Sequence, residues 1–355
     1  MGQKKALIAM SGGVDSSAAA HLAALEGYAC IGGTMVLYDG EDSSCCSRDA
    51  VEDARSVADR LGIPFHVFDF RGEFRDAVIG NFVDSYEKGL TPNPCVRCNR
   101  HLKFGQLLEK ALALGCDCLV TGHYARVCLD PATGRYLLKK GLDEGKDQSY
   151  FLYALTQEQI SRIRFPLGHM SKEAVRTVAE EQGFRNARKR DSQDICFIPD
   201  GDYGSFLRRW TGKDYPAGPF LDQNGNTVGT HRGAVNYTLG QRKGLGLAMG
   251  APVYVCAKSM EDNTVTVGPN EALFSRELLA RDWFFFPFDT LTQPIRVHAK
   301  VRSRMTEQPA WVYPEENGSC RVIFDEPQRA ITPGQAVVLY EGDTVVGGGT
   351  ILRVL

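Results

Sequence analysis

The sequence has no long hydrophobic run and almost no net charge. Nowhere in the 355 residues do roughly 18 apolar residues follow one another, so we predict no membrane-spanning helix. The apolar residues 6–10 are too few for the core of a secretory signal, and we therefore expect a cytoplasmic protein without a membrane partner. A formal net charge of −2 provides no global field to attract nucleic acid, so any polyanion site must come from local basic clusters.

Although the chain has 11 cysteines, it lacks a complete zinc-binding signature, because no fourth ligand stands at the usual spacing. Thiols stay reduced in the cytosol, and clustered cysteines there indicate metal binding or catalysis rather than disulfides. We assign no role to Cys116 and Cys118, which flank or enter a predicted buried strand where cysteine behaves as a small hydrophobic residue. The adjacent Cys45 and Cys46 are also poorly placed to chelate one metal together.

The first half of the chain alternates short apolar runs with helical patterns. The predicted strands cover residues 6–10, 30–36, 65–68 and 118–121, and the predicted helices cover 16–25, 48–61, 74–86 and 101–114. Such alternation predicts an α/β fold with a doubly wound parallel sheet. Beyond residue 205, glycine, proline and short β-rich runs dominate. We therefore predict an α/β domain over 1–204, a small central domain over 205–270 and a C-terminal β-barrel or sandwich over 271–355.

A glycine-rich loop, Ser11-Gly12-Gly13-Val14-Asp15-Ser16-Ser17, joins the first predicted strand to the first helix. Adjacent glycines let backbone N–H groups approach an anion, and the helix N-terminus behind them adds a favourable dipole and unpaired donors. The loop has no Gly-Lys-Ser/Thr ending, so transfer of a γ-phosphate is not indicated. We predict a nucleotide-phosphate site in which Asp15 helps to hold Mg²⁺.

This loop resembles the PP-loop of the N-type ATP pyrophosphatases, which transfer AMP from ATP to a substrate oxygen and release pyrophosphate. The resemblance implies that Met35 and Gly122 contact the adenosine. It also implies a phosphate cradle made of Ala9, Met10, Ser11, Gly12, Gly13, Val14, Asp15 and Ser16. Taken alone, the loop leaves NAD, GMP, asparagine and argininosuccinate synthetases open as well.

Cysteines stand in two further motifs, Asn93-Pro94-Cys95-Val96-Arg97-Cys98-Asn99-Arg100 and Asp191-Ser192-Gln193-Asp194-Ile195-Cys196-Phe197-Ile198. A thiolate can accept and pass on a sulfane sulfur by disulfide-type exchange, and a second thiol can then attack the persulfide. Arg97, Arg100 and a helix that begins after Cys98 would favour thiolates there.

These motifs resemble the bacterial tRNA-specific 2-thiouridylase family, together with Lys146-Asp147-Gln148-Ser149-Tyr150-Phe151-Leu152 and the segment 237–246. The resemblance covers nearly the whole chain and implies ATP-dependent 2-thiolation of the wobble uridine in tRNAs for Lys, Glu and Gln. It implies that Cys98 is the nucleophile and Cys196 the persulfide carrier, loaded by a cysteine desulfurase or a sulfur-relay protein. Asn93, Pro94 and Cys95 would contact the target base, and Lys146, Asp147 and Gln148 the tRNA.

Within this resemblance, the uracil is flipped out, its 2-oxygen attacks the α-phosphorus, and sulfur then displaces AMP. One residue departs from the pattern, because many members carry Asp, a candidate acid/base, where this chain has Cys95. Cys95, Cys98 and Cys196 could instead hold a [4Fe–4S] cluster with one open iron, or could be structural thiols. An ATP-dependent ligase or amidotransferase and a non-catalytic tRNA- or nucleotide-binding protein also remain open.

Basic residues recur at every second position from 296 to 304, as Arg296, His298, Lys300, Arg302 and Arg304. On a strand this spacing places all five on one face, where they would suit a phosphate backbone. We predict that Arg302 and Ser303 contact tRNA. Two smaller groups, within 185–190 and at Arg208, Arg209, Trp210 and Lys213, would add to the positive surface.

Overall fold

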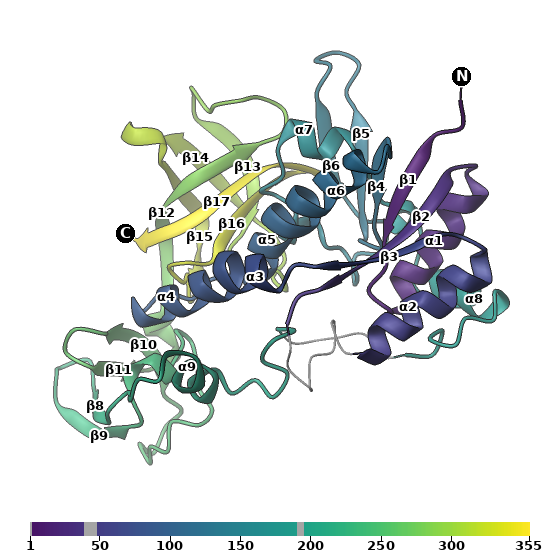
Figure 1. The fold of residues 1–355 in the computed structure, drawn as a ribbon. Coiled ribbons are helices and arrows are strands. Elements are labelled where there is room, and N and C mark those ends of the chain that lie inside the picture. The colour runs from purple at the N-terminus through teal and green to yellow at the C-terminus, as the bar shows by residue number, and fades with distance from the viewer. Residues whose placement is uncertain (1, 39–47, 190–194) are drawn as a thin grey trace.

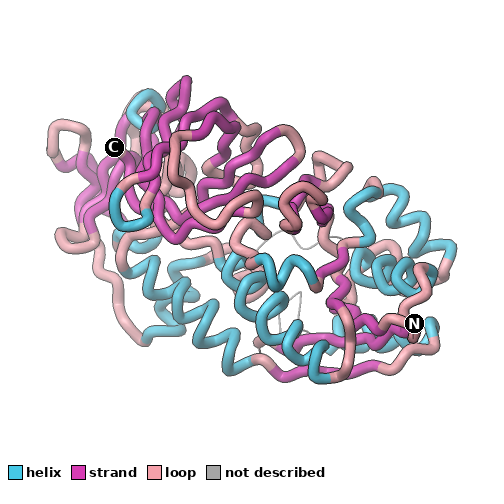
Figure 2. Tube along the Cα trace, turned by 90° about the horizontal axis from the view of Figure 1, so that it is seen from above, coloured by secondary structure: helices cyan, strands magenta, loops and turns pink. Residues whose placement is uncertain are grey.

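The computed structural model describes residues 2–38, 48–189 and 195–355, which form three units (Figure 1). An α/β unit carries the N-terminus, a small β-rich unit follows it, and a barrel carries the C-terminus. Seen from above, the barrel strands gather at one end of the molecule and helices line the other (Figure 2). This arrangement confirms the predicted fold class. Among the described residues, none of the helices is both long and apolar enough to cross a membrane.

The N-terminal sheet has five parallel strands in the order β3-β2-β1-β4-β7. They are β1 (Lys5–Ala9), β2 (Ala29–Val36), β3 (Phe65–Asp69), β4 (Cys118–Val120) and β7 (Ile163–Arg164). The chain runs from β1 outward to β3 and then returns to the other side of β1 as β4. The carboxyl ends of β1 and β4 therefore enclose the switch point, where open α/β sheets bind their ligands.

Helices cover both faces of this sheet. One face packs against α1 (Val14–Leu25), α2 (Arg48–Leu61) and α8 (Lys172–Glu181). The other face packs against two longer helices, each with a π-helical stretch in its middle. The first comprises α3 (Arg71–Phe74), η1 (Arg75–Gly80) and α4 (Asn81–Glu87), and the second α5 (Pro94–Arg97), η2 (Cys98–Gln106) and α6 (Leu107–Ala113). Shorter helical segments are η3 (Ser149–Phe151), α7 (Gln157–Ser161) and η4 (Pro166–His169).

The second of these longer helices begins at Pro94, so the prediction of a helix from residue 101 was wrong at its start. Asn93 caps the helix by accepting a hydrogen bond from the Val96 N–H, and Pro94 occupies the first helical position. Both residue types are typical of helix starts. The motif that carries Cys95 and Cys98 therefore forms the first turns of a helix rather than the segment before one.

The small central unit contains α9 (Tyr203–Thr211), the short helix η5 (Ala234–Asn236) and a four-stranded sheet in the order β10-β11-β8-β9. Its strands are β8 (Gly218–Leu221), β9 (Thr227–His231), β10 (Tyr254–Ser259) and β11 (Thr264–Gly268). Phe220, Val255 and Val265 are fully buried at its centre. This unit lies beside α4 on the side away from the N-terminal sheet (Figure 1).

Six strands close the C-terminal barrel in the order β12-β15-β14-β13-β16-β17, and β17 pairs back with β12. They are β12 (Phe274–Phe285), β13 (Ile295–Lys300), β14 (Gln308–Pro314), β15 (Cys320–Arg329), β16 (Ala336–Glu341) and β17 (Thr344–Val354), with η6 (Asn270–Leu273) and η7 (Glu316–Gly318) beside them. A hairpin from the α/β unit, β5 (Ala125–Leu129) and β6 (Tyr136–Lys140), joins the edge of β17. The barrel is thereby fixed to the N-terminal unit by main-chain pairing.

A turn of the barrel also holds the segment that leads into α5. The Thr91 N–H donates to the Pro333 oxygen at 2.9 Å, and Gln335 Nε2 donates to the Thr91 oxygen at 3.0 Å. Between them, Gly334 has φ +90°, and a Cβ there would lie 2.9 Å from the Thr91 nitrogen. Only glycine fits this contact without displacing the backbone that it touches.

We expect Gly334→Ala to lower the melting temperature by about 3 °C or more, because it adds both backbone strain and a steric clash. Gly342→Ala is the matched control, since Gly342 has φ +58° but no heavy atom within 4 Å of the position of its Cβ. Differential scanning calorimetry of both variants measures the difference. Equal melting temperatures would mean that the contact between Gly334 and Thr91 contributes nothing to stability.

Candidate active site

The loop between β1 and α1 is held in shape by its own hydroxyl groups. The Ser11 N–H donates to Ser16 Oγ at 3.1 Å, and the hydroxyls of Ser16 and Ser17 each donate to the Gly13 oxygen at 3.0 Å. Gly13 caps α1 without a side-chain hydrogen bond, so the first N–H groups of the helix are not capped by a side chain at that position. Such donors at a helix N-terminus are suited to an anion.

The other predicted nucleotide contacts lie around this loop, but not all of them can reach a ligand with their side chains. Met10 and Val14 are 2% and 3% exposed in the core, so only their backbone could contribute to a phosphate cradle. Ala9 and Met35 are half-buried against the core on the opposite face of the sheet. Gly122, just after β4, lies so close that a Cβ would be 2.7 Å from the Asp15 carbonyl carbon. The segment after β4 therefore contacts the first turn of α1 at the switch point.

Asp15 is the charged member of the loop, and it is already engaged. Its Oδ1 and Oδ2 accept hydrogen bonds from Lys172 Nζ at 2.7 and 2.8 Å, and Tyr124 OH donates to Oδ1 at 2.8 Å. Lys172 opens α8 and is 8% exposed. The sequence analysis missed it, because Lys172 is 157 positions away and belongs to no motif there.

The sequence analysis also missed the role of Asn186, which holds the loop through two hydrogen bonds. Its Nδ2 donates to the Gly12 oxygen at 3.0 Å and to Ser17 Oγ at 2.9 Å, and the residue is 3% exposed. The neighbouring Arg185 and Lys189 both pair with the buried Asp53, at 2.8 and 2.9 Å. These two members of the predicted basic group within 185–190 are thus paired with an acid, although their side chains are exposed at the surface, and Arg190 lies outside the described residues.

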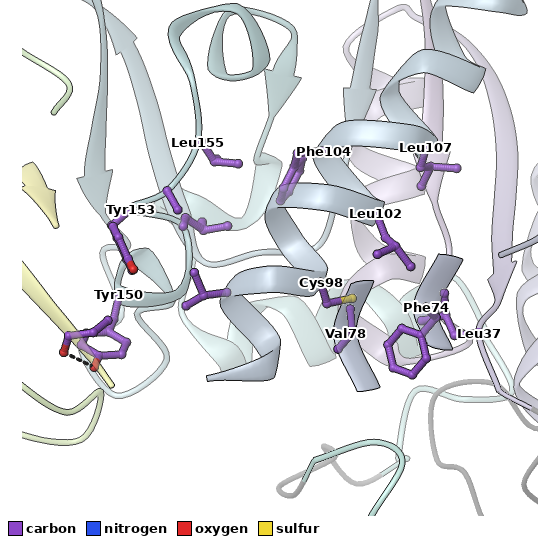
Figure 3. Close-up of a cluster of buried hydrophobic side chains, with 14 of the residues drawn as sticks. Leu37, Phe74, Val78, Cys98, Leu102, Phe104, Leu107, Tyr150, Tyr153 and Leu155 are labelled. Atoms are coloured by element: carbon purple, nitrogen blue, oxygen red, sulfur yellow. Dashed lines mark hydrogen bonds between the residues drawn. The ribbon is translucent and has the colours of Figure 1, made fainter. Parts of the chain in front are cut away.

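Cys98 lies in the hydrophobic core at the start of η2. It is 9% exposed, and its sulfur lies beside Val78 of the neighbouring helix (Figure 3). Cys95, one turn earlier, is exposed. Burial of the one thiol and exposure of the other distinguish two cysteines that the sequence motif places only three positions apart.

Cys196 reaches the same cluster from a distant part of the chain. It is half-buried, and its neighbour Phe197 packs into an aromatic group with ring centroids 5.7 Å from Phe74 and 5.3 Å from Phe82. Phe74, Val78 and Phe82 are spaced by four residues along one helix. The two cysteine-bearing segments are therefore brought to one helix, and residues 191–194 of the second motif lie outside the described residues.

The two arginines of the first motif make contacts of their own beside the cysteines. Arg97 Nε donates to the Ala77 oxygen at 2.9 Å, and the Arg100 guanidinium lies 4.3 Å from the centre of the Phe284 ring. Burial lowers the pKa of Arg97, and the nearby Arg100 lowers it further. Since α5 begins at Pro94, the positive end of the helix dipole is also closer to Cys95 than to Cys98.

The sequence suggested two metal sites, an iron–sulfur cluster and a magnesium ion, and each needs particular ligands. Within the part of the chain that the structure describes, no three His, Cys, Asp or Glu side chains are placed to hold a metal ion. Cys95, Cys98 and Cys196 are therefore not gathered into such a group in this structure. A magnesium ion is a different case, because it takes its ligands largely from water and substrate phosphates with one or two carboxylates. The phosphates of a nucleotide and the loop hydroxyls offer such ligands, whereas both Asp15 oxygens already accept hydrogen bonds from Lys172.

The segment Lys146, Asp147 and Gln148 lies behind Tyr124. Gln148 makes two hydrogen bonds with the Tyr124 backbone: its N–H donates to the Tyr124 oxygen at 2.9 Å, and its Oε1 accepts from the Tyr124 N–H at 3.0 Å. Asp147 accepts hydrogen bonds from the Gly141 and Ser149 N–H groups. The segment thus sets the position of Tyr124, whose hydroxyl reaches the phosphate loop.

His123 follows Gly122 after β4, and its surroundings favour the neutral form of its ring. Its ring lies 5.6 and 5.7 Å from the centres of the Phe104 and Phe165 rings, and its Nδ1 is 2.6 Å from Thr121 Oγ1. Burial lowers the pKa of His123 well below its usual value, and the charge of Lys103 lowers it further. A neutral imidazole is unsuited to donate a proton as a general acid near pH 7.

The predicted basic stripe is shorter than its sequence pattern. Strand β13 ends at Lys300, so Arg302 and Arg304 do not continue the same face. Lys300 is buried and pairs with Glu307 at 3.7 Å, while Arg302 Nη2 donates to the oxygens of Leu239, Ala330 and Thr332 at 3.0 to 3.3 Å. The prediction that all five basic residues share one strand face was therefore wrong.

Trp210 and Lys213 of the third predicted basic group also contact other parts of the protein. The Trp210 ring stacks on Phe206 with centroids 5.9 Å apart, so it packs within the protein. Lys213 pairs with Glu87 of α4 at 2.7 Å, which ties the central unit to the helix beside Cys98. Trp210 is partly buried against the hydrophobic core and therefore contributes to packing.

Comparison with known proteins covers the whole chain. Family models match residues 4–200 as a tRNA methyl transferase HUP domain, 204–269 as a tRNA methyl transferase PRC-barrel domain and 275–351 as an aminomethyltransferase beta-barrel domain. The tRNA-specific 2-thiouridylase MnmA of Acetivibrio thermocellus is 50% identical over 99% of this chain and 100% of its own length. That of Heliobacterium modesticaldum is 51% identical over 98% of this chain and 92% of its own length.

A distant likeness to a solved structure adds nothing to this. The U34-tRNA thiolase NcsA of Methanococcus maripaludis, solved with its [4Fe-4S] cluster, is 17% identical over 59% of this chain and 66% of its own chain. Its TM-score is 0.36, and we infer nothing from it.

Proposed function

The chain belongs to the family of tRNA-specific 2-thiouridylases, and we propose that it uses ATP to replace the 2-oxygen of the wobble uridine of tRNA with sulfur. It is a tRNA sulfurtransferase. The observation that carries the proposal is the meeting of two distant cysteine segments on one helix, beside a sheet whose switch point carries a phosphate loop. An adenylating site and a sulfur-carrying site are the two parts that this reaction needs.

The nucleotide site lies at the switch point between β1 and β4. We place the triphosphate over Ala9, Met10, Ser11, Gly12, Gly13, Val14, Asp15 and Ser16, with Met35 and Gly122 toward the adenosine. The N-terminal donors of α1 and the loop N–H groups would bind the phosphates, and Mg²⁺ bound with ATP would shield their charge. Attack by the uracil 2-oxygen on the α-phosphorus then forms an adenylated base and releases pyrophosphate.

The sulfur route fits the burial of the two thiols. Cys196 is half-buried and is assigned as the persulfide carrier, whereas Cys98 is 9% exposed and is assigned as the nucleophile. A sulfur donor can reach the more open thiol, and the enclosed one can complete the transfer away from water. The terminal sulfur of the Cys196 persulfide attacks C2 of the adenylated uridine and displaces AMP, which leaves the base joined to Cys196 by an S–S bond. The Cys98 thiolate then attacks the Cys196 sulfur and breaks that bond, which releases 2-thiouridine and leaves a disulfide between Cys98 and Cys196 that an external thiol reductant must reduce.

We further propose that Asn93, Pro94 and Cys95 contact the target base, and that Lys146, Asp147, Gln148, Arg302 and Ser303 contact the tRNA. The tRNAs for Lys, Glu and Gln are the proposed substrates, and a cysteine desulfurase or a sulfur-relay protein is the proposed donor. Cys95 is exposed in the first turn of α5, which leaves its side chain accessible to a base. The family pattern to which this chain is similar often has Asp at this position, so with Cys95 here acid/base help must come from another residue or be unnecessary.

One assay tests this function against its alternatives. The purified protein is incubated with unmodified tRNA, Mg-ATP, cysteine and a cysteine desulfurase, and the digested nucleosides are analysed by mass spectrometry. We expect 2-thiouridine together with AMP and pyrophosphate in equal amounts. A ligase would form AMP and pyrophosphate with a different acceptor and no thiolated base. A protein that only binds tRNA or nucleotide would form neither product.

The proposed tRNA contact at Lys146 has its own test. We expect Lys146→Gln to weaken tRNA binding about fivefold and to reduce the slope of log Kd against log salt concentration by about 0.9, as for one lost phosphate contact. Lys88→Gln is the control, because it removes the same charge from an exposed residue at the end of α4 to which we assign no contact. Filter binding at several salt concentrations measures both slopes. Equal slopes for the two variants would exclude a phosphate contact by Lys146.

A further inference from the structure

We propose that Lys172 is a positioning residue of the ATP site, and that it acts by neutralising and holding the Asp15 carboxylate of the phosphate loop. The inference rests on the proposed use of ATP and adds a residue that no motif of the loop contains. Lys172 Nζ lies 2.7 Å from one Asp15 oxygen and 2.8 Å from the other, so a single ammonium group bridges the whole carboxylate.

The burial of the pair shows that this contact is built into the fold. The Lys172 side chain is 10% exposed and that of Asp15 is 31% exposed. Lysine is almost never buried at this level unless it is paired. The lysine is the more enclosed partner, so it approaches the carboxylate from the protein side and leaves the loop surface toward the switch point for a ligand.

Three further contacts fix the two partners. Ser171 caps α8 by accepting a hydrogen bond from the Ala174 N–H, and the Lys172 N–H donates to Asp143 Oδ2 at 2.9 Å. Tyr124, which is 2% exposed, donates its hydroxyl hydrogen to Asp15 Oδ1 at 2.8 Å. Since Gln148 holds the Tyr124 backbone, the carboxylate is fixed from both α8 and the segment after β4.

The negative charge of the triphosphate explains why the Asp15 carboxylate needs a cationic partner. A carboxylate within a phosphate-binding loop repels the negatively charged triphosphate, and at short range this repulsion is strong where solvent is largely excluded. A bridging ammonium cancels that charge and keeps the carboxylate turned toward α8. The backbone N–H groups and hydroxyls of the loop then face the phosphates without an opposing charge.

The same contact changes the prediction made for Asp15. We expected this residue to help to hold Mg²⁺, yet both of its oxygens already accept hydrogen bonds from a cation. A second cation on the same oxygens would be repelled by the ammonium group. The geometry thus assigns Asp15 to loop positioning through Lys172, and leaves the magnesium ion to be held chiefly by the phosphates themselves.

The test measures, by calorimetry on the full chain, the binding of Mg²⁺ with α,β-methylene-ATP. The AMP group of this analogue cannot be transferred to a substrate. We expect Lys172→Met to weaken binding about 30-fold or more, because it leaves the Asp15 charge uncompensated. The double variant Asp15→Asn/Lys172→Met removes both charges and should recover binding to within about fivefold of the wild type. Lys172→Arg, which keeps the charge, should stay within about tenfold.

Lys140→Met is the matched control, since Lys140 also forms a largely buried ion pair, with Glu307, but at the barrel hairpin. Binding by Lys172→Met within threefold of wild type would overturn the proposal. So would a double variant as weak as the single one, because Lys172 would then act on the phosphates directly and not through Asp15. If Lys172→Met does not fold, the double variant and Lys172→Arg still decide between these outcomes. Failure of the wild-type protein to bind the analogue would instead overturn the proposed use of ATP.

Discussion

Replacement of either Cys98 or Cys196 by serine should reduce the formation of 2-thiouridine by at least about a thousandfold, while the binding of Mg²⁺ with α,β-methylene-ATP stays unchanged. A serine hydroxyl cannot carry a sulfane sulfur or attack a persulfide as a thiolate does, so sulfur transfer stops although adenylation remains possible. Single-turnover assays that include the sulfur donor, followed by nucleoside mass spectrometry, measure the loss in both variants. Serine differs from cysteine by one atom, so the packing around Val78 and Phe197 changes little.

Cys95→Ser separates the relay from a mechanism that needs three thiols. In the proposed relay only Cys98 and Cys196 carry sulfur, so Cys95→Ser should keep at least about a tenth of the activity. A cluster held by three cysteines would lose its function with any one of them. Cys118→Ser is the structural control, because Cys118 is 2% exposed within β4 and burial raises the pKa of its thiol. Equal loss in Cys95→Ser and Cys98→Ser would contradict the relay.

The two thiol variants should also differ in one intermediate. Cys196→Ser should accept no sulfur from the donor, whereas Cys98→Ser should accumulate the persulfide on Cys196. Mass spectrometry of the intact protein after incubation with the donor distinguishes the two. Persulfide on Cys98 in the Cys196→Ser variant would reverse the assigned roles, which would conflict with the lower exposure of Cys98.

Much of the fold was predictable because its signals are local. The alternation of buried runs and helical spacing fixed the parallel sheet, and the loop at residues 11–17 stood between a strand and a helix as its glycines indicated. Errors arose where the start of a helix or the end of a strand was placed incorrectly. The Asn93-Pro94 pair is a helix-start signature, yet the helix was expected from residue 101. The alternating basic residues continued past Lys300, where the chain leaves its strand.

The parts of the site that sequence reasoning missed are those made by distant residues. Nothing around Lys172 marks it as a partner of Asp15, because the pair forms only when α8 packs against α1. Phe197 is likewise an ordinary apolar residue until it packs between Phe74 and Phe82. A motif defines which atoms are available for chemistry, whereas the long-range packing defines which of them meet.

Gly12→Ala should weaken the binding of Mg²⁺ with α,β-methylene-ATP by about a hundredfold, equivalent to about 2.7 kcal/mol. Gly12 has φ +72°, and a Cβ there would lie 2.2 Å from the Ala50 oxygen of α2. Alanine therefore adds left-handed backbone strain of about 1–2 kcal/mol and also forces the loop away from α2. Because Asn186 holds the Gly12 oxygen from the other side, the loop cannot move without losing that hydrogen bond.

Two other glycines show whether this loss comes from the loop geometry. Gly13 has ordinary backbone angles and its nearest contact would be Ser11 Oγ at 3.5 Å, so Gly13→Ala should weaken binding by about tenfold or less. Gly62→Ala carries similar strain at φ +64°, with no atom within 4 Å, at the end of α2, and should leave binding unchanged. Calorimetric titration of the three variants gives the order directly. If Gly12→Ala binds as tightly as Gly62→Ala, the loop conformation does not determine the affinity, and the phosphates must be held chiefly by residues outside it.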